Sequence, residues 1–329
     1  MTSEPLLEVL DGGLLTTIQD AGRPDSIHLG VPESGAADPW SRAVANLLAG
    51  NDPDSAVLEA TIVGPTLRAL GPVTVALAGA DLGARIAGRP VAPGRTHRLE
   101  PGDVLELPGG SGDACRAYLA VPGGFDVPGL LGSRSTCLPA EFGGLDGRPL
   151  RAGDVLSGPV HRDGIPPERV WPGEGVRAPA GEDATAALRV VRGPSAGLDL
   201  ILATDWRVSP ASDRVGIRLE GDALPSEVGG EATTFGVPWG AIQVPSDGRP
   251  IVLGPDHQTT GGYRVVGAVV SADRPVLGQL APGARVRFVE TTRDAAVAAL
   301  RHRRDALERG AAALREAAHW DALAHAAGG

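Results

Sequence analysis

The chain has 329 residues and a formal net charge of -10 at pH 7. All 30 of its basic residues are arginines, so the sequence contains no lysine. The absence of lysine excludes a Walker-type phosphate loop, a pyridoxal-phosphate Schiff base and covalently attached biotin on this chain. The acidic balance, without any basic stripe, also argues against a nucleic-acid partner.

Cysteine and histidine usage argues against a resident metal ion. The only cysteines are Cys115 and Cys137, which complete neither a disulfide framework nor a structural zinc site without histidine ligands. The seven histidines include no pair four residues apart. We therefore expect no metal site built from these side chains.

Two further features predict a cytoplasmic location. Residues 1–8 lack the basic start and the apolar run of a signal peptide. The longest apolar stretch, residues 73–80, is far shorter than a membrane span. We therefore expect a cytoplasmic protein that makes no membrane contact.

Composition predicts a mainly β protein with few helices. The chain has 47 glycines and 29 prolines but only 3% aromatic residues, so small aliphatic side chains must form the core of a backbone that turns often. A first β-rich lobe is predicted over residues 1–160, with one short helix near 39–49. Asp38 suits the N-cap of this helix, Pro39 its first position and Gly50 its end.

The second half of the chain repeats the strand-and-turn pattern. Residues 161–185 are rich in proline and glycine and are predicted to form a linker, and residues 186–290 are predicted to form a second β lobe. A Pro-Gly turn that leads into an alternating strand occurs at 99–107 and again at 280–288, with a shorter echo at 150–156. This similarity favours two β-barrel-like lobes. The alternative is chance recurrence of a common turn.

Residues 291–329 form a predicted helical extension. Its larger apolar side chains lie on one alanine-rich face: Val297, Leu300, Leu307 and Leu314. Gly310 is expected to weaken the helix. The extension either docks on the second lobe or a partner, or frays in solution.

Three segments gather side chains that suit a small polar ligand. The first contains Gln19, Asp20 and Arg23, the second contains Asp81, and the third extends from Gln243 to Tyr263. Amide and guanidinium groups pair with the amide and carboxylate groups of a ligand, and the neighbouring glycines allow close approach. The alternative for each segment is a hydrogen-bonded turn between strands.

These segments share their motifs and order with one family. In the first half the likeness is carried by residues 17–23 (TIQDAGR), 30–38 (GVPESGAAD), 118–124 (YLAVPGG) and 131–136 (LGSRST). In the second half it is carried by residues 212–221 (SDRVGIRLEG), 240–245 (GAIQVP) and 256–263 (DHQTTGGY). Over roughly residues 7–290 the chain resembles the allophanate hydrolase subunit 2 family, also called the biotin-dependent carboxyltransferase family, whose members include the C subunit of 5-oxoprolinase.

The resemblance implies a fold, a reaction and partners. It implies two cyclophilin-like β lobes, and an ATP-dependent opening of the 5-oxoproline lactam, a small cyclic amide, to glutamate. It also implies a complex with two proteins that resemble the B subunit (kinase-inhibitor-like) and the A subunit of 5-oxoprolinase. ATP with Mg²⁺ would bind on this chain or on a partner, and any biotin would be attached to another chain.

The same resemblance implies where the site lies. The candidate catalytic residues, as bases or as groups that position the lactam, are Asp20, Asp256, Gln258 and Tyr263. The candidate substrate-binding residues, with the arginines as carboxylate clamps, are Gln19, Arg23, Asp81, Arg134, Arg214, Gln243 and Thr259.

Three functions remain open at this point. The first is the C subunit of a 5-oxoprolinase, active only in a complex. The second is an allophanate hydrolase or carboxyltransferase component of urea or amide metabolism. The third is a regulatory protein that sequesters a kinase inhibitor without catalysis.

Overall fold

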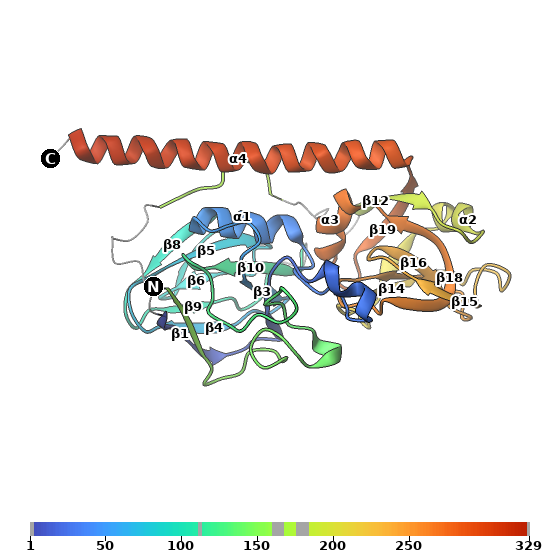
Figure 1. Cartoon of the computed structure of the whole chain (residues 1–329), viewed down its shortest axis with the longest axis horizontal. Coiled ribbons are helices and arrows are strands. Elements are labelled where there is room, and N and C mark those ends of the chain that lie inside the picture. Colours follow the sequence, from blue (N-terminus) through green and yellow to red (C-terminus); the bar gives the residue numbers. More distant parts are fainter. Residues whose placement is uncertain (1–2, 111–113, 160–167, 176–183, 328–329) are drawn as a thin grey trace.

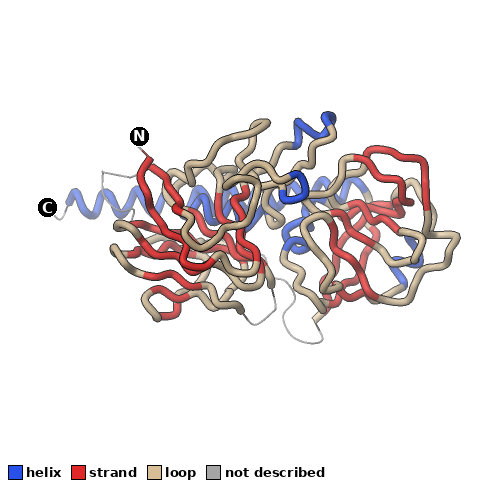
Figure 2. The backbone as a smooth tube through the Cα atoms, turned by 90° about the horizontal axis from the view of Figure 1, so that it is seen from below, coloured by secondary structure: helices blue, strands red, loops and turns tan. Residues whose placement is uncertain are grey.

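The computed structural model describes residues 3–110, 114–159, 168–175 and 184–327, with side chains up to residue 318. It shows two β-rich lobes side by side and one long helix that lies along both (Figure 1). Seen from below, the strands gather in two groups (Figure 2). The predicted mainly β class is confirmed. The predicted linker, residues 161–185, lies mostly outside the described residues, and the lobe boundaries stay a prediction.

The first lobe consists of two sheets that share one apolar core. Their strand orders are β11-β1-β4-β9-β6-β7 and β2-β3-β10-β5-β8. The strands are β1 (Ser3–Asp11), β2 (Leu15–Gln19), β3 (Val57–Thr61), β4 (Thr66–Ala69), β5 (Val73–Gly79), β6 (Arg85–Ile86), β7 (Arg89–Pro90), β8 (Arg95–Leu99), β9 (Val104–Glu106), β10 (Arg116–Ala120) and β11 (Val155–Pro159).

Helix α1 (Pro39–Ala49) covers the outer face of the second of these sheets. The predicted helix signals are confirmed, because the Asp38 carboxylate caps the first turn and Gly50 ends the helix in the left-handed region. Strand β5 is buried on both faces: Val75 faces the lobe core, while Ala76 packs under the helix. Small side chains on this face let the helix approach the sheet closely.

The second lobe is a closed barrel. Its strands follow the order β12-β19-β13-β14-β17-β16-β18, and β18 pairs with β12 to close the ring. An eighth strand, β15, lies outside this ring and pairs with the first residues of β18. The strands are β12 (Thr185–Arg192), β13 (Trp206–Val208), β14 (Gly216–Glu220), β15 (Glu231–Gly236), β16 (Ala241–Val244), β17 (Ile251–Leu253), β18 (Thr260–Val269) and β19 (Arg285–Glu290).

Short helices lie in the connections of both lobes. They are η1 (Pro24–Leu29), η2 (Leu138–Ala140), α2 (Leu198–Ala203), η3 (Ser271–Asp273) and α3 (Arg274–Gly278). The repeated turns predicted from the sequence are present. Gly102, Gly153 and Gly283 each have a positive φ, which glycine adopts without strain, and each precedes a strand.

Helix α4 (Arg293–Ala327) docks on both lobes rather than on one alone. It contacts η3 and β12 of the second lobe and α1 of the first lobe (Figure 1). The expectation that Gly310 is a weak point is wrong. A Cβ at Gly310 would lie 2.3 Å from the Trp171 ring, so glycine forms the notch that receives this ring. No described helix combines the length and apolar character of a membrane span.

The end of α3 inserts between the lobes. Gln279, which follows this helix, is fully buried and uses its whole amide. Its Nε2 donates to Asp38 Oδ2 (2.8 Å) and to the Arg116 carbonyl (2.9 Å), and its Oε1 accepts from the Arg116 N–H (2.9 Å). One side chain of the second lobe therefore fixes both the start of α1 and the start of β10.

Candidate functional site

A buried ion-pair network joins the two lobes at Arg214. This residue precedes β14, and its guanidinium donates to Asp256 (2.8 and 3.1 Å), to the Gly35 carbonyl (2.7 Å) and to Glu59 of the first lobe. Burial alone lowers the pKa of Arg214, but the charges of Asp256 and Glu59 outweigh it and raise the pKa. These acceptors occupy all three nitrogens, so Asp256 holds Arg214 within the second lobe while Glu59 and Gly35 bind it from the first lobe.

Glu59 is satisfied on both of its oxygens. Its Oε2 accepts from the Ala37 N–H (2.7 Å) and from the Tyr118 hydroxyl (2.8 Å), which in turn accepts from the Asp38 N–H (2.8 Å). Burial, with the nearby carboxylates, raises the pKa of Tyr118 well above its ordinary value. Glu59 was not among the predicted site residues, although a lone carboxylate in the apolar strand β3 is a visible signal.

Asp20 fixes the turn that contains the first predicted segment. Its carboxylate accepts from the hydroxyls of Ser133 (2.6 Å) and Ser135 (2.5 Å), from the Gly22 N–H (2.8 Å) and from the Arg134 N–H. The predicted residues Asp20 and Arg134 are thus brought together through the Arg134 backbone. These contacts use the acceptor capacity of Asp20, so the structure gives it a role in positioning the turn.

Arg23 differs from Arg214 because it keeps free donors. One nitrogen donates to the Ser135 carbonyl (2.5 Å), while Nε and Nη1 have no partner among the described residues. Its guanidinium lies 4.8 Å from the centre of the Phe142 ring, and the residue is only 2% exposed. Burial lowers the pKa of Arg23. Nearby negative charges, Asp256 among them, act in the opposite direction but do not outweigh burial.

Three more buried groups near this turn lack a partner within the described part of the chain. Gln19 Nε2 donates to Thr17 and to the Thr136 carbonyl, but its Oε1 is unpaired. The Ser34 hydroxyl is also unpaired, although its N–H donates to the Pro255 carbonyl (2.8 Å). The third group is Nε2 of His257.

His257 is poised as a neutral acceptor. Its Nδ1 lies 2.6 Å from the Gln258 carbonyl, which only accepts hydrogen bonds, so Nδ1 carries a proton, and in the neutral ring Nε2 is then the acceptor. Burial lowers the pKa of His257, which favours the uncharged ring. No sequence pattern signals this role, because the tautomer depends on the local loop geometry.

Backbone hydrogen bonds connect the segments that carry these groups. The Arg23 N–H donates to the Glu33 carbonyl (2.7 Å), and Ser34 bonds to Pro255, next to Asp256. We refer to Gln19, Arg23, Ser34 and His257 as the inter-lobe polar site. An unsatisfied buried polar group costs about 1–3 kcal/mol, so each of these four groups would gain from a ligand or water partner.

The remaining predicted residues lie elsewhere. Gln258 is exposed on the outside of the barrel, and its Nε2 donates weakly to Gln243 Oε1 (3.4 Å). Thr259, the next residue in the chain, is partly buried. Asp81 is exposed after β5 and accepts from the Gly83 N–H (2.9 Å) as part of a turn. Tyr263 lies on β18 and lines a surface pocket of the second lobe.

The described residues provide no site for a metal held by the protein alone. Among them, no group of three or more histidine, cysteine, aspartate or glutamate side chains is placed to hold an ion. Magnesium that arrives with a nucleotide needs only one or two carboxylates beside the phosphates.

Comparison with known proteins identifies relatives over most of the chain. Residues 29–290 match the family model described as "Carboxyltransferase domain, subdomain A and B". The chain is 36% identical to the C subunit of 5-oxoprolinase from Escherichia coli over 89% of its own length and 94% of that protein. It is 30% identical to urea amidolyase of Lachancea kluyveri over 86% of its length, but spans only 17% of that protein.

Solved structures agree with this assignment. The crystal structure of Kluyveromyces lactis urea carboxylase matches with a TM-score of 0.81 and 28% identity, over 94% of this chain and 29% of that one. The family-level resemblance seen in the sequence motifs is therefore confirmed. The chain belongs to the carboxyltransferase domain family, subdomains A and B.

Proposed function

We propose that the chain is the C subunit of a cytoplasmic 5-oxoprolinase, which opens the lactam of 5-oxoproline to glutamate with hydrolysis of ATP. The observation that carries the proposal is length: the chain covers 94% of its Escherichia coli 5-oxoprolinase relative, whereas it corresponds to a small part of urea amidolyase. As the name of that relative says, the unit would be one of several subunits. The partners proposed are a B-type (kinase-inhibitor-like) and an A-type 5-oxoprolinase protein.

The inter-lobe polar site supports this substrate class. 5-Oxoproline carries a carboxylate beside a lactam N–H and carbonyl. The two unpaired guanidinium nitrogens of Arg23 suit the carboxylate, and the unpaired Gln19 Oε1 suits the lactam N–H. A neutral His257 Nε2 suits the role of a base toward water.

The proposed reaction overcomes the poor reactivity of an amide carbonyl. The lactam oxygen takes the terminal phosphoryl group of ATP, and ADP leaves. Water, losing a proton to His257, adds to the activated carbon. The C–N bond then breaks, the nitrogen takes a proton, and an acyl phosphate remains. A second water hydrolyses it to glutamate and phosphate.

The experiment that tests the proposal is co-expression with the B-type and A-type proteins, followed by assay of 5-oxoproline, urea and allophanate with and without ATP. We expect a co-purifying complex that releases glutamate from 5-oxoproline only with ATP. Turnover of urea or allophanate with none of 5-oxoproline would overturn the proposal. So would a chain that never associates with those proteins.

Substitution of Arg23 tests the substrate clamp within that complex. Because a hydrogen bond to a charged group contributes about 1.5–3 kcal/mol, Arg23→Gln should raise KM for 5-oxoproline by roughly 10-fold to 150-fold. Arg68→Gln is the matched control, since Arg68 forms an exposed pair with Glu8. Unchanged KM in a variant with a normal melting temperature would remove Arg23 from the site.

The second candidate is a carboxyltransferase component of urea metabolism. It is favoured by the structural match to Kluyveromyces lactis urea carboxylase, which has a TM-score of 0.81 over 94% of this chain. With no lysine, this chain would receive carboxyl groups from biotin attached to another protein. ATP-dependent urea carboxylation by a complex that contains a biotinylated partner would establish it.

A further inference from the structure

The outer face of the second-lobe barrel carries a pocket that the proposed lactam chemistry does not use. We propose that this pocket binds a small organic anion with two negatively charged groups. Its volume is about 650 Å³, within the range of small-molecule sites and larger than a single inorganic ion fills. Its lining includes Arg218, Glu220, Asp247, Arg249, Ile251 and Tyr263.

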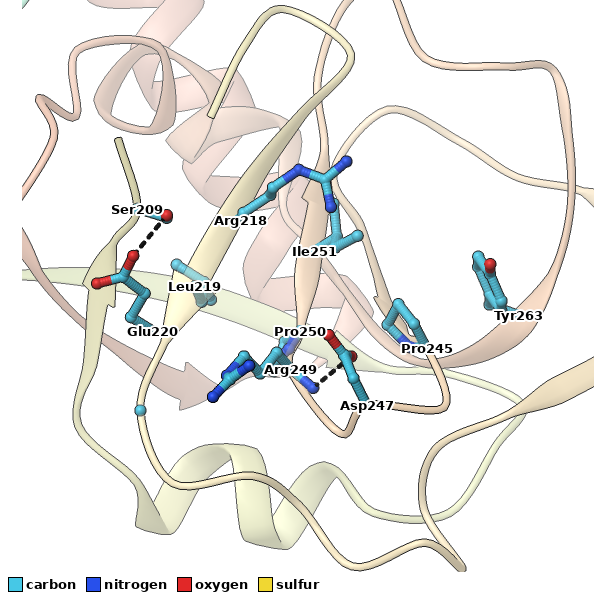
Figure 3. A pocket seen from close by; sticks show the side chains of 11 residues that line it. Ser209, Arg218, Leu219, Glu220, Pro245, Asp247, Arg249, Pro250, Ile251 and Tyr263 are labelled. Atoms are coloured by element: carbon cyan, nitrogen blue, oxygen red, sulfur yellow. Dashed lines mark hydrogen bonds between the residues drawn. The ribbon is translucent and has the colours of Figure 1, made fainter. Parts of the chain in front are cut away.

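The strand register places the pocket on the outside of the barrel. Arg218 of β14 pairs with Ile251 of β17, and both side chains point away from the barrel core, whereas the neighbouring Leu219 points inward. Figure 3 shows the Arg218 side chain beside Ile251, with Arg249 below them in the same view. Two prolines and Ile251 give the pocket an apolar surface between its charged groups.

The two arginines of the pocket keep their donors free. Neither the Arg218 nor the Arg249 guanidinium forms a hydrogen bond or ion pair with any other described residue. The pocket also contains the carboxylates of Glu220 and Asp247, which keep their negative charge while each is held by a local hydrogen bond. Glu220 accepts from the Ser209 hydroxyl (2.5 Å), and Asp247 accepts from the backbone N–H of Arg249 (3.1 Å).

Tyr263 adds a third donor and an aromatic ring. Its side chain is 41% exposed, and no described residue provides a partner for its hydroxyl. In Figure 3 it stands across the pocket from Arg249, with Pro245 between them. The arrangement has separated cationic and polar groups with an apolar surface between them, which fits a ligand with a short organic spacer between two oxyanions.

The experiment is titration calorimetry on the full chain without partners. Glutarate represents dicarboxylates and propane-1,3-diol bisphosphate represents bisphosphates, each with a three-carbon spacer. We expect binding of at least one probe in the millimolar range or tighter, weakened by added salt. Preference for glutarate identifies a carboxylate ligand, and preference for the bisphosphate identifies a phosphate ligand.

Variants locate the binding in this pocket. Arg218→Gln and Arg249→Gln should each weaken binding by roughly tenfold or more, and Tyr263→Phe by less. Arg287→Gln, at an exposed position on β19 outside the pocket, is the matched control and should leave the affinity unchanged. Circular dichroism melting shows whether each variant folds.

Three results would overturn the proposal. They are no binding of either probe, unchanged affinity in both pocket variants, or an equal loss in Arg287→Gln, which would indicate general charge attraction. The test needs neither ATP nor partner proteins. Failure of the lactam assay therefore does not contradict the anion site, and the absence of anion binding does not contradict the lactam proposal.

Discussion

Two buried arginines differ in role because they have different numbers of hydrogen-bond acceptors around them. Arg214 meets two carboxylates and a carbonyl, whereas Arg23 meets one carbonyl and an aromatic face. The sequence identified both as candidate clamps because guanidinium groups suit carboxylates. It could not tell them apart, because the acceptors of Arg214 come from Gly35, Glu59 and Asp256, far from it in the chain.

The buried imidazole of His257 predicts a pH effect on stability. Burial lowers its pKa below the ordinary value of 6.5, so the unfolded chain binds a proton at a pH where the folded chain does not. The contribution to the free energy of unfolding is therefore complete above pH 6.5 and is lost as the pH falls toward the folded pKa. Denaturant unfolding between about pH 8 and about pH 5 measures it.

We expect His257→Gln to reduce this loss, so that wild type and variant approach each other in stability at the acid end. The exposed residue His302 supplies the control, and His302→Gln should keep the wild-type pH dependence. A pH profile that is the same for wild type and His257→Gln would contradict the buried neutral ring.

Elements differ in how far local sequence determines them. The boundaries of α1 were readable from Asp38, Pro39 and Gly50 because capping depends on neighbours within one turn. The burial of β5 on both faces was visible in the sequence as a continuous apolar run. For α4 the local rules misled, because they treat Gly310 by propensity alone, and its packing partner Trp171 lies in a distant segment.

Gly310→Ala tests the docking of α4. In an isolated helix the change would stabilise by about 1 kcal/mol. Here the new methyl group would overlap the Trp171 ring, so we expect a lower melting temperature. In the background of Trp171→Ala the ring is gone, and the same change should stabilise. Stabilisation by Gly310→Ala in the wild-type background would show that the ring does not fill this notch.

At the scale of the whole molecule, long-range polar contacts set the arrangement of the lobes. Gln279 and Asp38 are 241 residues apart, and Arg214 and Glu59 are 155 apart. Of these four residues, only Arg214 was predicted as a site residue. Their pairing follows from the relative position of two folded lobes, which no local pattern in the sequence encodes.

Removal of the central cation should destabilise the whole chain. Arg214→Met leaves Asp256 buried without its counter-charge and leaves Glu59 with only the more distant Arg116 (3.6 Å), and we expect a loss of about 3–5 kcal/mol in the free energy of unfolding. Arg68→Met, which breaks the exposed pair with Glu8, should cost about 0–1 kcal/mol. Equal effects of the two substitutions in denaturant unfolding would argue against the network as the link between the lobes.

The Arg214 network also limits how the molecule can move. A hinge that swung the lobes apart would break the Arg214–Glu59 ion pair and the Gln279–Asp38 hydrogen bond at the same time. Opening of the whole seam therefore requires these contacts to be lost together, whereas a rearrangement of surface loops leaves them in place.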